Sequence, residues 1–192
     1  MPPAVVREIQ RDRLLKATVE VVAREGYAAT TVRRLLAEAK LSRRTYYDLY
    51  HDKEDCYLDA FGRIADELAG RVAAEFERGS TARERIRLAI EALPRFCVAE
   101  PAAACACIAE GLAAGHAARA ARAALMERLT ATLAPAFAEL HPASSDPTLA
   151  ARVAIGGVFE LLYGPLARRD LDRLRDLTER IGELPIVPAA TR

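Results

Sequence analysis

The chain has 192 residues, 52% of them hydrophobic and 29% charged, which is enough for one ordinary domain or two small ones that share a core. The sequence has no run of about eighteen apolar residues and no apolar segment ahead of a cleavage site, so we expect a cytoplasmic protein without a membrane span. The net charge of +1 is unevenly placed: residues 1–51 hold ten basic and six acidic side chains, and the remainder holds eighteen and twenty-one. A basic head on an acidic body indicates that the head meets a polyanion.

The first predicted element is a helix over residues 5–24, in which Leu15, Val19 and Val22 fall on one apolar stripe. Gly26 follows it and is predicted to end it. The arginines near its start, Arg7, Arg11 and Arg13, either reach a DNA backbone or are solvated surface charges.

The next stretch of sequence predicts three more helix starts. Thr30 or Thr31, Ser42 and Asp52 each offer a side-chain oxygen to an otherwise unpaired backbone N–H at a helix start. The first two of these helices are short and are joined by a tight turn at 39–41, so they must cross steeply. This is the geometry of a helix-turn-helix.

The second short helix begins with residue types that suit DNA recognition. Arg43 and Arg44 stand at the end that reaches base edges in a major groove, and an arginine fork can bond guanine O6 and N7 together. The hydroxyl groups of Thr45 and Tyr47 can bond phosphate oxygens. Lys53 lies in the first turn of the helix that Asp52 caps, where a positive charge is unfavourable for the helix dipole. A phosphate beside Lys53 would explain this placement. For any single arginine, a solvated surface charge is an equally good interpretation. The predicted DNA-binding residues are Thr31, Arg33, Ser42, Arg43, Arg44, Thr45, Tyr47 and Lys53.

A longer pattern runs through this stretch without a gap. It consists of Gly26-Tyr27, Thr30-Thr31-Val32, Ala39, Leu41-Ser42, Thr45, Tyr47, Tyr50 and Lys53-Glu54. In this pattern the stretch resembles the DNA-binding domain of the TetR (tetracycline-repressor) family. Lys40 stands where the family commonly has glycine, at a position that can require φ > 0, while Tyr46 replaces an aliphatic residue and Leu49 a histidine.

The remaining sequence predicts a helical body. A helix of roughly 26 residues, about 39 Å long, starts at Lys53 and would join head to body without a flexible linker. Further helices are expected from residue 80 or 81 with a bend at Pro94, then over 101–115, 116–140, 149–168 and 171–184. We therefore predict an all-α fold with a three-helix helix-turn-helix domain over 1–52 and a helical effector-binding and dimerisation domain over 53–192.

The last two predicted helices carry the candidate dimer surface. The helix over 149–168 has two apolar stripes, one through Ile155 and Leu162 and the other through Val153 and Leu161, so burial on both sides is expected. The TetR family pairs its subunits here through a four-helix bundle, and an ordinary intramolecular core is the alternative. The predicted interface residues are Ile155, Val158, Leu162, Leu166, Leu171, Leu174, Thr178 and Ile181.

If the family's packing holds, the body helices also form a mostly apolar pocket, which suits a small lipophilic or aromatic effector. Taken singly, such residues are more often plain core. The predicted pocket residues are Phe96, Cys105, Leu112, Met126, Phe159 and Tyr163.

The sequence contains no familiar catalytic, nucleotide-binding or metalloprotease motif, so we expect neither an enzyme nor a cofactor or metal. Cys105 and Cys107 lie about 200° apart around a helix and cannot face one ion together. The alternative function is a thiol- or metal-responsive regulator that uses the region of Cys97, Cys105 and Cys107 with His116.

The main prediction is a homodimeric repressor, released from an inverted-repeat operator by a small ligand. The sequence has no asparagine and a single glutamine, Gln10, so the amide fork that reads adenine is missing from the recognition helix. Guanines are therefore expected opposite Arg43 and Arg44.

Overall fold

The structure, a computed structural model, describes residues 2–142 and 146–183, and within these residues it holds helices and no strand. The predicted all-α fold is therefore confirmed. Its helices are α1 (Pro3–Glu25), α2 (Val32–Ala39), α3 (Arg43–Tyr47), α4 (Lys53–Glu77), α5 (Ala82–Ala99), α6 (Pro101–Ala104), α7 (His116–Leu140), α8 (Pro147–Arg168) and α9 (Leu171–Arg180). A π-helical turn (Cys105–Ala109) and a 3-10 turn (Glu110–Leu112) follow α6, and a second 3-10 turn (Ile181–Glu183) follows α9.

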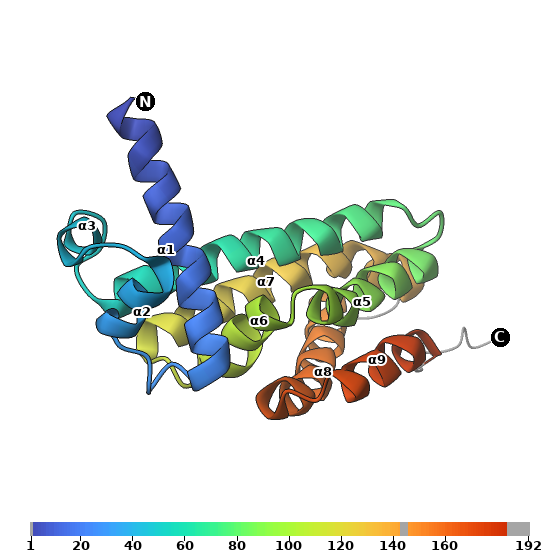
Figure 1. The fold of residues 1–192 in the computed structure, drawn as a ribbon. Coiled ribbons are helices and arrows are strands. Elements are labelled where there is room, and N and C mark those ends of the chain that lie inside the picture. The colour runs from blue at the N-terminus through green and yellow to red at the C-terminus, as the bar shows by residue number, and fades with distance from the viewer. Residues whose placement is uncertain (1, 143–145, 184–192) are drawn as a thin grey trace.

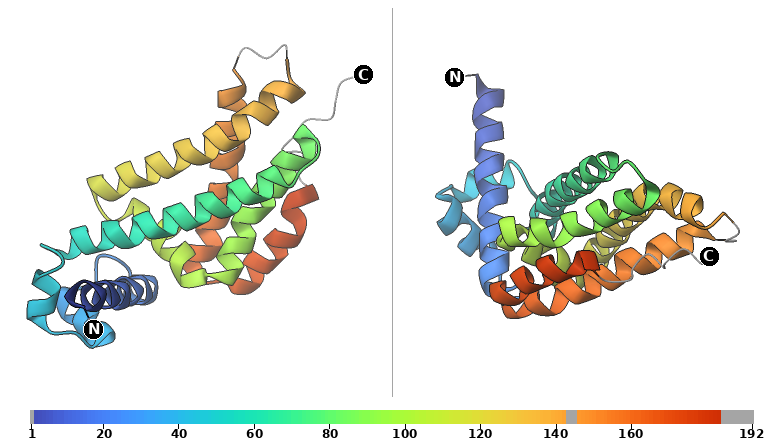
Figure 2. Two further views of the ribbon diagram at one scale, coloured as in Figure 1. Left: turned by 90° about the horizontal axis from the view of Figure 1, so that it is seen from above. Right: turned by 90° about the vertical axis from the view of Figure 1, so that its right-hand side faces the viewer.

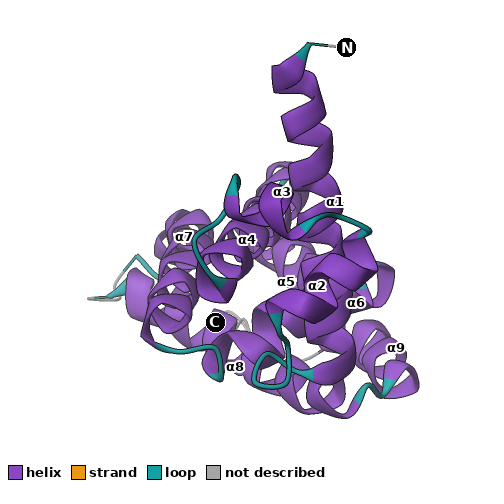
Figure 3. Cartoon of the chain, turned by 60° about the vertical axis from the view of Figure 1, so that its left-hand side comes forward, coloured by secondary structure: helices purple, strands orange, loops and turns teal. Residues whose placement is uncertain are grey.

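Helices α1, α2 and α3 form a head at one end of the molecule (Figure 1). The side chains of Thr31, Ser42 and Asp52 accept the backbone N–H three residues further on, so each predicted helix start is confirmed. These caps satisfy N–H groups that the short helices could not pair internally. Figure 3, in which this side comes forward, shows α1 rising beyond the two short helices.

The head has a core of its own, and Tyr46 lies in its centre. This side chain is 0% exposed and packs with Leu14, Leu35 and Tyr50. Its hydroxyl group donates to the backbone carbonyl of Asp52 at 2.7 Å. A tyrosine can therefore replace an aliphatic residue here, because its polar end reaches a partner.

Helix α4 belongs to both the head and the body. Cys56 and Ala60 pack in the head core, whereas Phe61, Ile64 and Leu68 pack in the larger core of the body. Figure 2 shows α4 running from the head along the body beside α5 and α7. The predicted absence of a flexible linker follows from this shared helix, and the domain division at 52/53 stays a prediction.

The predicted continuous helix over 101–115 is wrong, because the chain widens into the π turn after four residues. Tyr57 of α4 donates its hydroxyl to the carbonyl of Ala106 at 2.7 Å, which gives that carbonyl a partner outside the helix. Gly111 then allows close packing, since a Cβ at this position would lie 3.2 Å from the Phe61 ring. Contacts from α4, which no local pattern reveals, therefore set the shape of this segment.

Helix α8 is the most apolar helix of the body. By length and composition alone it could cross a membrane, although 44% of its most apolar 18-residue window is buried within the protein. Its packing against α7 and the other body helices is sufficient to explain its apolar composition.

The turn between α2 and α3 contains a non-glycine residue with a positive φ. Lys40 has φ 53 and ψ 47, so the positive φ considered from the sequence is confirmed. We predict that Lys40→Gly raises the free energy of unfolding by about 1 kcal/mol, because glycine adopts this conformation without a Cβ clash. Thermal unfolding should show an increase of roughly 2–4 °C.

Arg169 provides the matched control, since it also has a positive φ of 56. Its guanidinium donates to the carbonyls of Ala23 at 3.0 Å and Arg24 at 2.5 Å, so Arg169→Gly should lower stability instead. A decrease for both variants would contradict our reading of Lys40.

Candidate nucleic-acid interface and effector region

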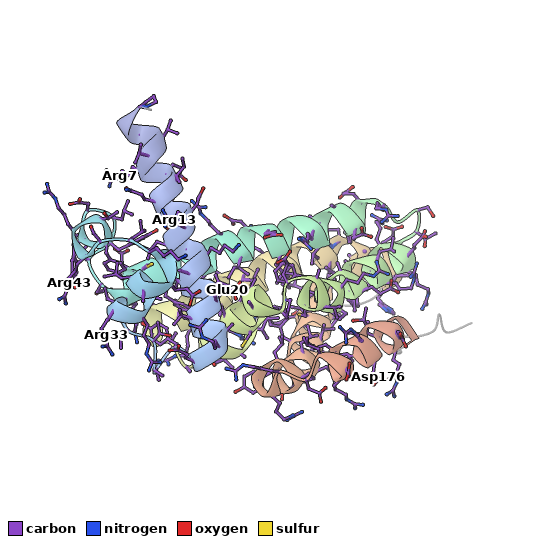
Figure 4. All side chains as sticks on the ribbon, in the orientation of Figure 1. Arg7, Arg13, Glu20, Arg33, Arg43 and Asp176 are labelled. Carbon is purple, nitrogen blue, oxygen red and sulfur yellow. The ribbon has the colours of Figure 1, made fainter. Side chains whose placement is uncertain are left out.

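The recognition helix α3 presents three exposed side chains, Arg43, Arg44 and Tyr47, the last of which is 51% exposed. Arg33 of α2 is exposed at the same end of the molecule, and Figure 4 places Arg33 and Arg43 there, away from α9 and its Asp176. Within the described ranges, no ion pair or hydrogen bond engages the side chains of Arg33, Arg43 or Arg44. They are therefore available to an anionic partner.

Other basic side chains of the head are already engaged. Arg34 pairs with Glu25, and Arg24 pairs with Glu38 at 2.9 Å. Arg13 donates to the carbonyl of Ala39 at 2.7 Å, and Arg7 donates to that of Asp48 at 3.2 Å. Arg7 and Arg13 thus bind carbonyls at the ends of α3 and α2, a role that neither sequence interpretation of them included.

Two predicted contact residues have structural roles as helix caps, and a third is hydrogen-bonded to one of them. Thr31 and Ser42 hold the N-termini of α2 and α3, and Ser42 Oγ also lies 2.9 Å from Thr45 Oγ1. The hydroxyl groups of Ser42 and Thr45 lie at the start of α3, where unpaired N–H groups favour an anion. Phosphate contacts by Thr31, Ser42, Thr45 and Tyr47 stay predictions.

Lys53 requires a correction. Its Nζ donates to the carbonyl of Tyr27 at 2.9 Å and lies 4.1 Å from the centroid of the Tyr27 ring. Burial lowers its pKa from the ordinary value. The cation thus has a partner within the protein, and the argument that its position requires a phosphate no longer holds. DNA contact by Lys53 stays a prediction without that support.

A brace of three side chains joins the loop after α3 to α1 and α4. Arg11 donates to both carboxylate oxygens of Asp59, at 2.8 and 2.6 Å, and Tyr50 donates to the same carboxylate. Burial alone would raise the pKa of Asp59, but the hydrogen bonds from Arg11 and Tyr50 outweigh it and hold the pKa below its usual value. Arg11 is therefore a structural residue and not a free surface charge.

Most of the predicted dimer residues lie in the core of the single chain, which is the intramolecular alternative considered from the sequence. Ile155, Val158, Leu162 and Leu166 are only 0–2% exposed in the single chain, so they form its own core. Leu174 and Ile181 are buried as well, and Thr178 donates its hydroxyl to the carbonyl of Leu174. Of the eight predicted residues, Leu171 is exposed, at 39%.

The second stripe of α8 is the exposed one. Val153 is 66% exposed, Leu149 56% and Leu161 44%, and Gly157 is exposed between them. These residues recur every four positions and form an apolar surface outside the body core. This surface replaces the predicted one as the candidate interface.

Among the described residues, the predicted pocket residues are divided between the core and the surface, and their role in binding a ligand stays a prediction. Phe96 and Phe159 are core residues at 1% exposure, whereas Leu112 and Tyr163 are exposed at 41% and 38%. Cys105 lines a hollow of about 380 Å³ between α1, α6, α8 and α9. Its other lining residues are Glu20, Ala23, Arg24, Pro101, Ala102, Leu166, Arg169, Leu171 and Leu174.

The cysteines are all buried and unbridged. Burial raises the pKa of the Cys107 thiol to about 12 and also raises the pKa of Cys97 and Cys105, so the reactive thiolate is disfavoured. Among the described residues, no group of three or more His, Cys, Asp or Glu side chains could hold a metal ion. The thiol or metal alternative gains no support from this arrangement.

Sequence reasoning missed Arg122, a half-buried residue of α7. Its guanidinium is 5.4 Å from the centroid of the Phe159 ring, and its Nε is buried without a hydrogen-bond partner in the part of the chain that the structure describes. The signal was present in the sequence, because Arg122 falls on the apolar stripe of α7 between Ala118 and Leu125.

Comparison with known proteins gives one family and one fold. Residues 14–60 match the family of bacterial regulatory proteins called the tetR family. The fatty acid metabolism regulator protein of Bacillus subtilis (strain 168) is 27% identical over 78 residues, which are 41% of this chain and 40% of that protein. The matched part thus spans less than half the length of this relative.

Two solved structures share the fold over almost the whole chain. The fatty acid degradation regulator FadR from Bacillus halodurans has a TM-score of 0.82 at 16% identity and covers 100% of this chain and 99% of its own. The transcriptional regulator FadR from Bacillus subtilis, in complex with stearoyl-CoA, has a TM-score of 0.79 at 19% identity, with 92% and 98% covered.

The brace yields a pH-dependent prediction. Asp59→Asn should lower the free energy of unfolding by about 1.5–3 kcal/mol at pH 7, because charge-assisted hydrogen bonds from Arg11 and Tyr50 are lost. A lowered carboxyl pKa stabilises the fold above the unfolded value near 3.9, and this contribution is lost as the pH falls through the folded pKa. Urea titrations at pH 7, 4 and 3 should therefore show the difference between wild type and variant shrinking below about pH 4.

Asp66→Asn is the matched control. Asp66 pairs with Arg128 at 2.7 Å, but its side chain is 74% exposed, so its loss should have less than about 1 kcal/mol of effect at any pH. Equal effects of the two substitutions would show that the brace is no stronger than a surface pair.

Proposed function

We propose that this chain, which belongs to the TetR family of bacterial regulatory proteins as its sequence predicted, is a cytoplasmic repressor that binds an inverted-repeat operator and is released by a small ligand. The observation that carries the proposal is the pair of exposed, unpaired arginines at the start of α3 in a helix-turn-helix. Regulation of transcription is the function of this family, and it needs no catalytic site.

In this proposal α3 enters the major groove with its N-terminus foremost. Arg43 and Arg44 bond guanine O6 and N7, and Thr45 and Tyr47 bond phosphate oxygens on either side. The head supports this role because Arg7, Arg11 and Arg13 hold its helices in place while Arg33, Arg43 and Arg44 remain free for DNA.

Two heads must be presented together to read an inverted repeat. We propose that the homodimer forms through the exposed stripe of α8, where Gly157 lies between Val153 and Leu161 and allows a second helix to approach closely. The two recognition helices would then reach half-sites one helical turn, or a multiple of it, apart.

Ligand response requires that the body and the head move together. Glu110 accepts the backbone N–H of Tyr27 at 2.8 Å, and Arg169 donates to the carbonyls that end α1, so the head is tied to the segments after α6 and α8. A ligand that binds the body better in a DNA-incompetent arrangement would weaken repression through these ties. The solved relative with stearoyl-CoA supports a lipophilic acyl compound as the effector class.

The recognition arginines can be tested with an operator selected in vitro from random duplexes. We expect G·C pairs at the central half-site positions, and Arg44→Ala should bind the selected duplex with about 1–3 kcal/mol less free energy and lose preference at one position. Fluorescence anisotropy on the selected duplex and on single-position variants measures both effects.

Arg119→Ala is the control, because it removes an exposed arginine from α7 in the body. Its affinity and base preference should equal those of wild type. A selected operator without G·C at these positions, or an unchanged preference in Arg44→Ala, would refute the assignment.

The dimer surface gives a separate prediction. Val153→Glu should raise the dimer dissociation constant by at least about 100-fold, because an unpaired buried charge costs about 3–5 kcal/mol. Sedimentation velocity over a concentration series measures the change. Val5→Glu, on the exposed start of α1, is the matched control and should remain dimeric; equal behaviour of the two variants would exclude the α8 stripe.

A further inference from the structure

The apolar stripe of α7 contains one charged residue. Ala118, Leu125, Leu129 and Leu133 are 0–1% exposed and recur at the helical spacing that faces a core. Arg122 occupies the position between Ala118 and Leu125, four residues after the first and three before the second. It therefore points from the core-facing side of α7 and not from its solvent-facing side.

The surroundings of Arg122 are apolar. Arg122 is half-buried, and its guanidinium carbon lies 5.4 Å from the centroid of the buried Phe159 ring on α8. Its positive charge partly offsets the rise in the pKa of Cys107, in the π turn, that burial causes. Met126, one turn further along α7, is a partly buried side chain that packs against the same core. The cation thus sits where α7, α8 and the π turn meet.

No carboxylate neutralises this cation among the residues that the structure describes. Its Nε is buried and has no hydrogen-bond partner there. Other body arginines behave differently: Arg128 pairs with Asp66, and Arg152 pairs with Glu127. A buried N–H without an acceptor is unfavourable, and an apolar side chain of similar volume would serve the core better.

We infer that Arg122 anchors the anionic group of a lipophilic organic acid, which binds where α7, α8 and the π turn meet. The planar guanidinium fork matches a carboxylate or phosphate, and the orphaned Nε–H supplies a donor that such a group would satisfy. Phe159 and Met126 provide apolar contacts for the rest of the molecule. This inference rests on the proposed ligand response and specifies its chemistry.

The first test uses the protein without ligand. Arg122→Met replaces an unpaired cation with an apolar side chain of similar length, so its thermal midpoint should be unchanged or a few degrees higher than that of wild type. Arg119→Met, on the exposed side of the same helix, is the control for charge removal. A clearly lower midpoint for Arg122→Met alone would mean that Arg122 serves the fold, and would overturn the inference.

The second test measures ligand-induced stabilisation with stearate, stearoyl-CoA and the neutral analogue octadecanol. At roughly 100-fold excess over the dissociation constant, a bound acid should raise the wild-type midpoint by about 5–10 °C. Arg122→Met should bind the acid about 10- to 100-fold more weakly, Arg122→Lys should retain part of the affinity, and Arg119→Met should match wild type. Octadecanol should not distinguish wild type from Arg122→Met.

The two acids separate the possible sources of the anion. A shift with stearate that needs Arg122 identifies the free carboxylate, and a shift with stearoyl-CoA alone that needs Arg122 identifies the coenzyme A conjugate; either supports the inference. It is wrong if neither compound shifts the wild-type midpoint, or if the shift survives in Arg122→Met. It is also wrong if Arg122→Met weakens the dimer in sedimentation, because a second copy then pairs the cation. These measurements contain no DNA, so failure to bind an operator would contradict the proposed function separately.

Discussion

Tyr27, in the loop after α1, joins the head to the body through its backbone and its ring. The backbone N–H of Tyr27 donates to Glu110, its carbonyl accepts from Lys53, and its ring lies 4.8 Å from that of Tyr57. Tyr57 in turn donates to Ala106 in the π turn. The loop that precedes the helix-turn-helix is thus bonded to α4 and to the segment after α6 at once. A shift of that segment cannot leave the head where it was unless these bonds break.

The shortness of α3 explains why the head has so many internal side-chain contacts. A helix of five residues such as α3 has too few hydrogen bonds to hold itself, and most of its stability must come from its neighbours. Tyr46 anchors α3 in the core of the head, and Arg7 binds the carbonyl at its end. Tyr50 joins the loop that follows α3 to Asp59. The backbone that carries Arg43 and Arg44 is therefore already ordered, so binding to DNA costs little backbone conformational entropy.

The parts of the structure that could be predicted from the sequence are those with local causes. A side-chain cap depends on residues three apart, so Thr31, Ser42 and Asp52 could be identified from the sequence. The positive φ at Lys40 was expected because the TetR family, which the stretch resembles, commonly has glycine there. The segment after Ala104 was not readable, because the hydroxyl of Tyr57 reaches it from a residue 49 positions away. Lys53 was misread for a similar reason: its partner, the carbonyl of Tyr27, is 26 residues distant.

Helix α8 shows a different limit. Its two apolar stripes were both recognised, but hydrophobic periodicity states only that a face is buried and not against what. The stripe through Ile155 and Leu162 meets α7 and the core, and the stripe through Val153 and Leu161 is left outside. Spacing alone gives no means of choosing between them, since both repeat at three and four residues. The choice depends on how the body helices are stacked, which is a tertiary property.

Whether an arginine has a hydrogen-bond acceptor within the protein is a better guide to function here than the presence of a rare residue such as cysteine. Cysteines drew attention in the sequence, yet each is buried, and burial raises the pKa of each thiol, which makes it a weak nucleophile. Arginines are common throughout, and those that brace the fold have identifiable acceptors, as Arg11, Arg13 and Arg169 do. Among the described residues, Arg43 and Arg44 on the surface and the half-buried Arg122 have no such acceptor. An exposed guanidinium is solvated by water at little cost, whereas a buried Nε–H without an acceptor is unfavourable, so a missing anion is better supported at Arg122 than at the DNA-facing surface.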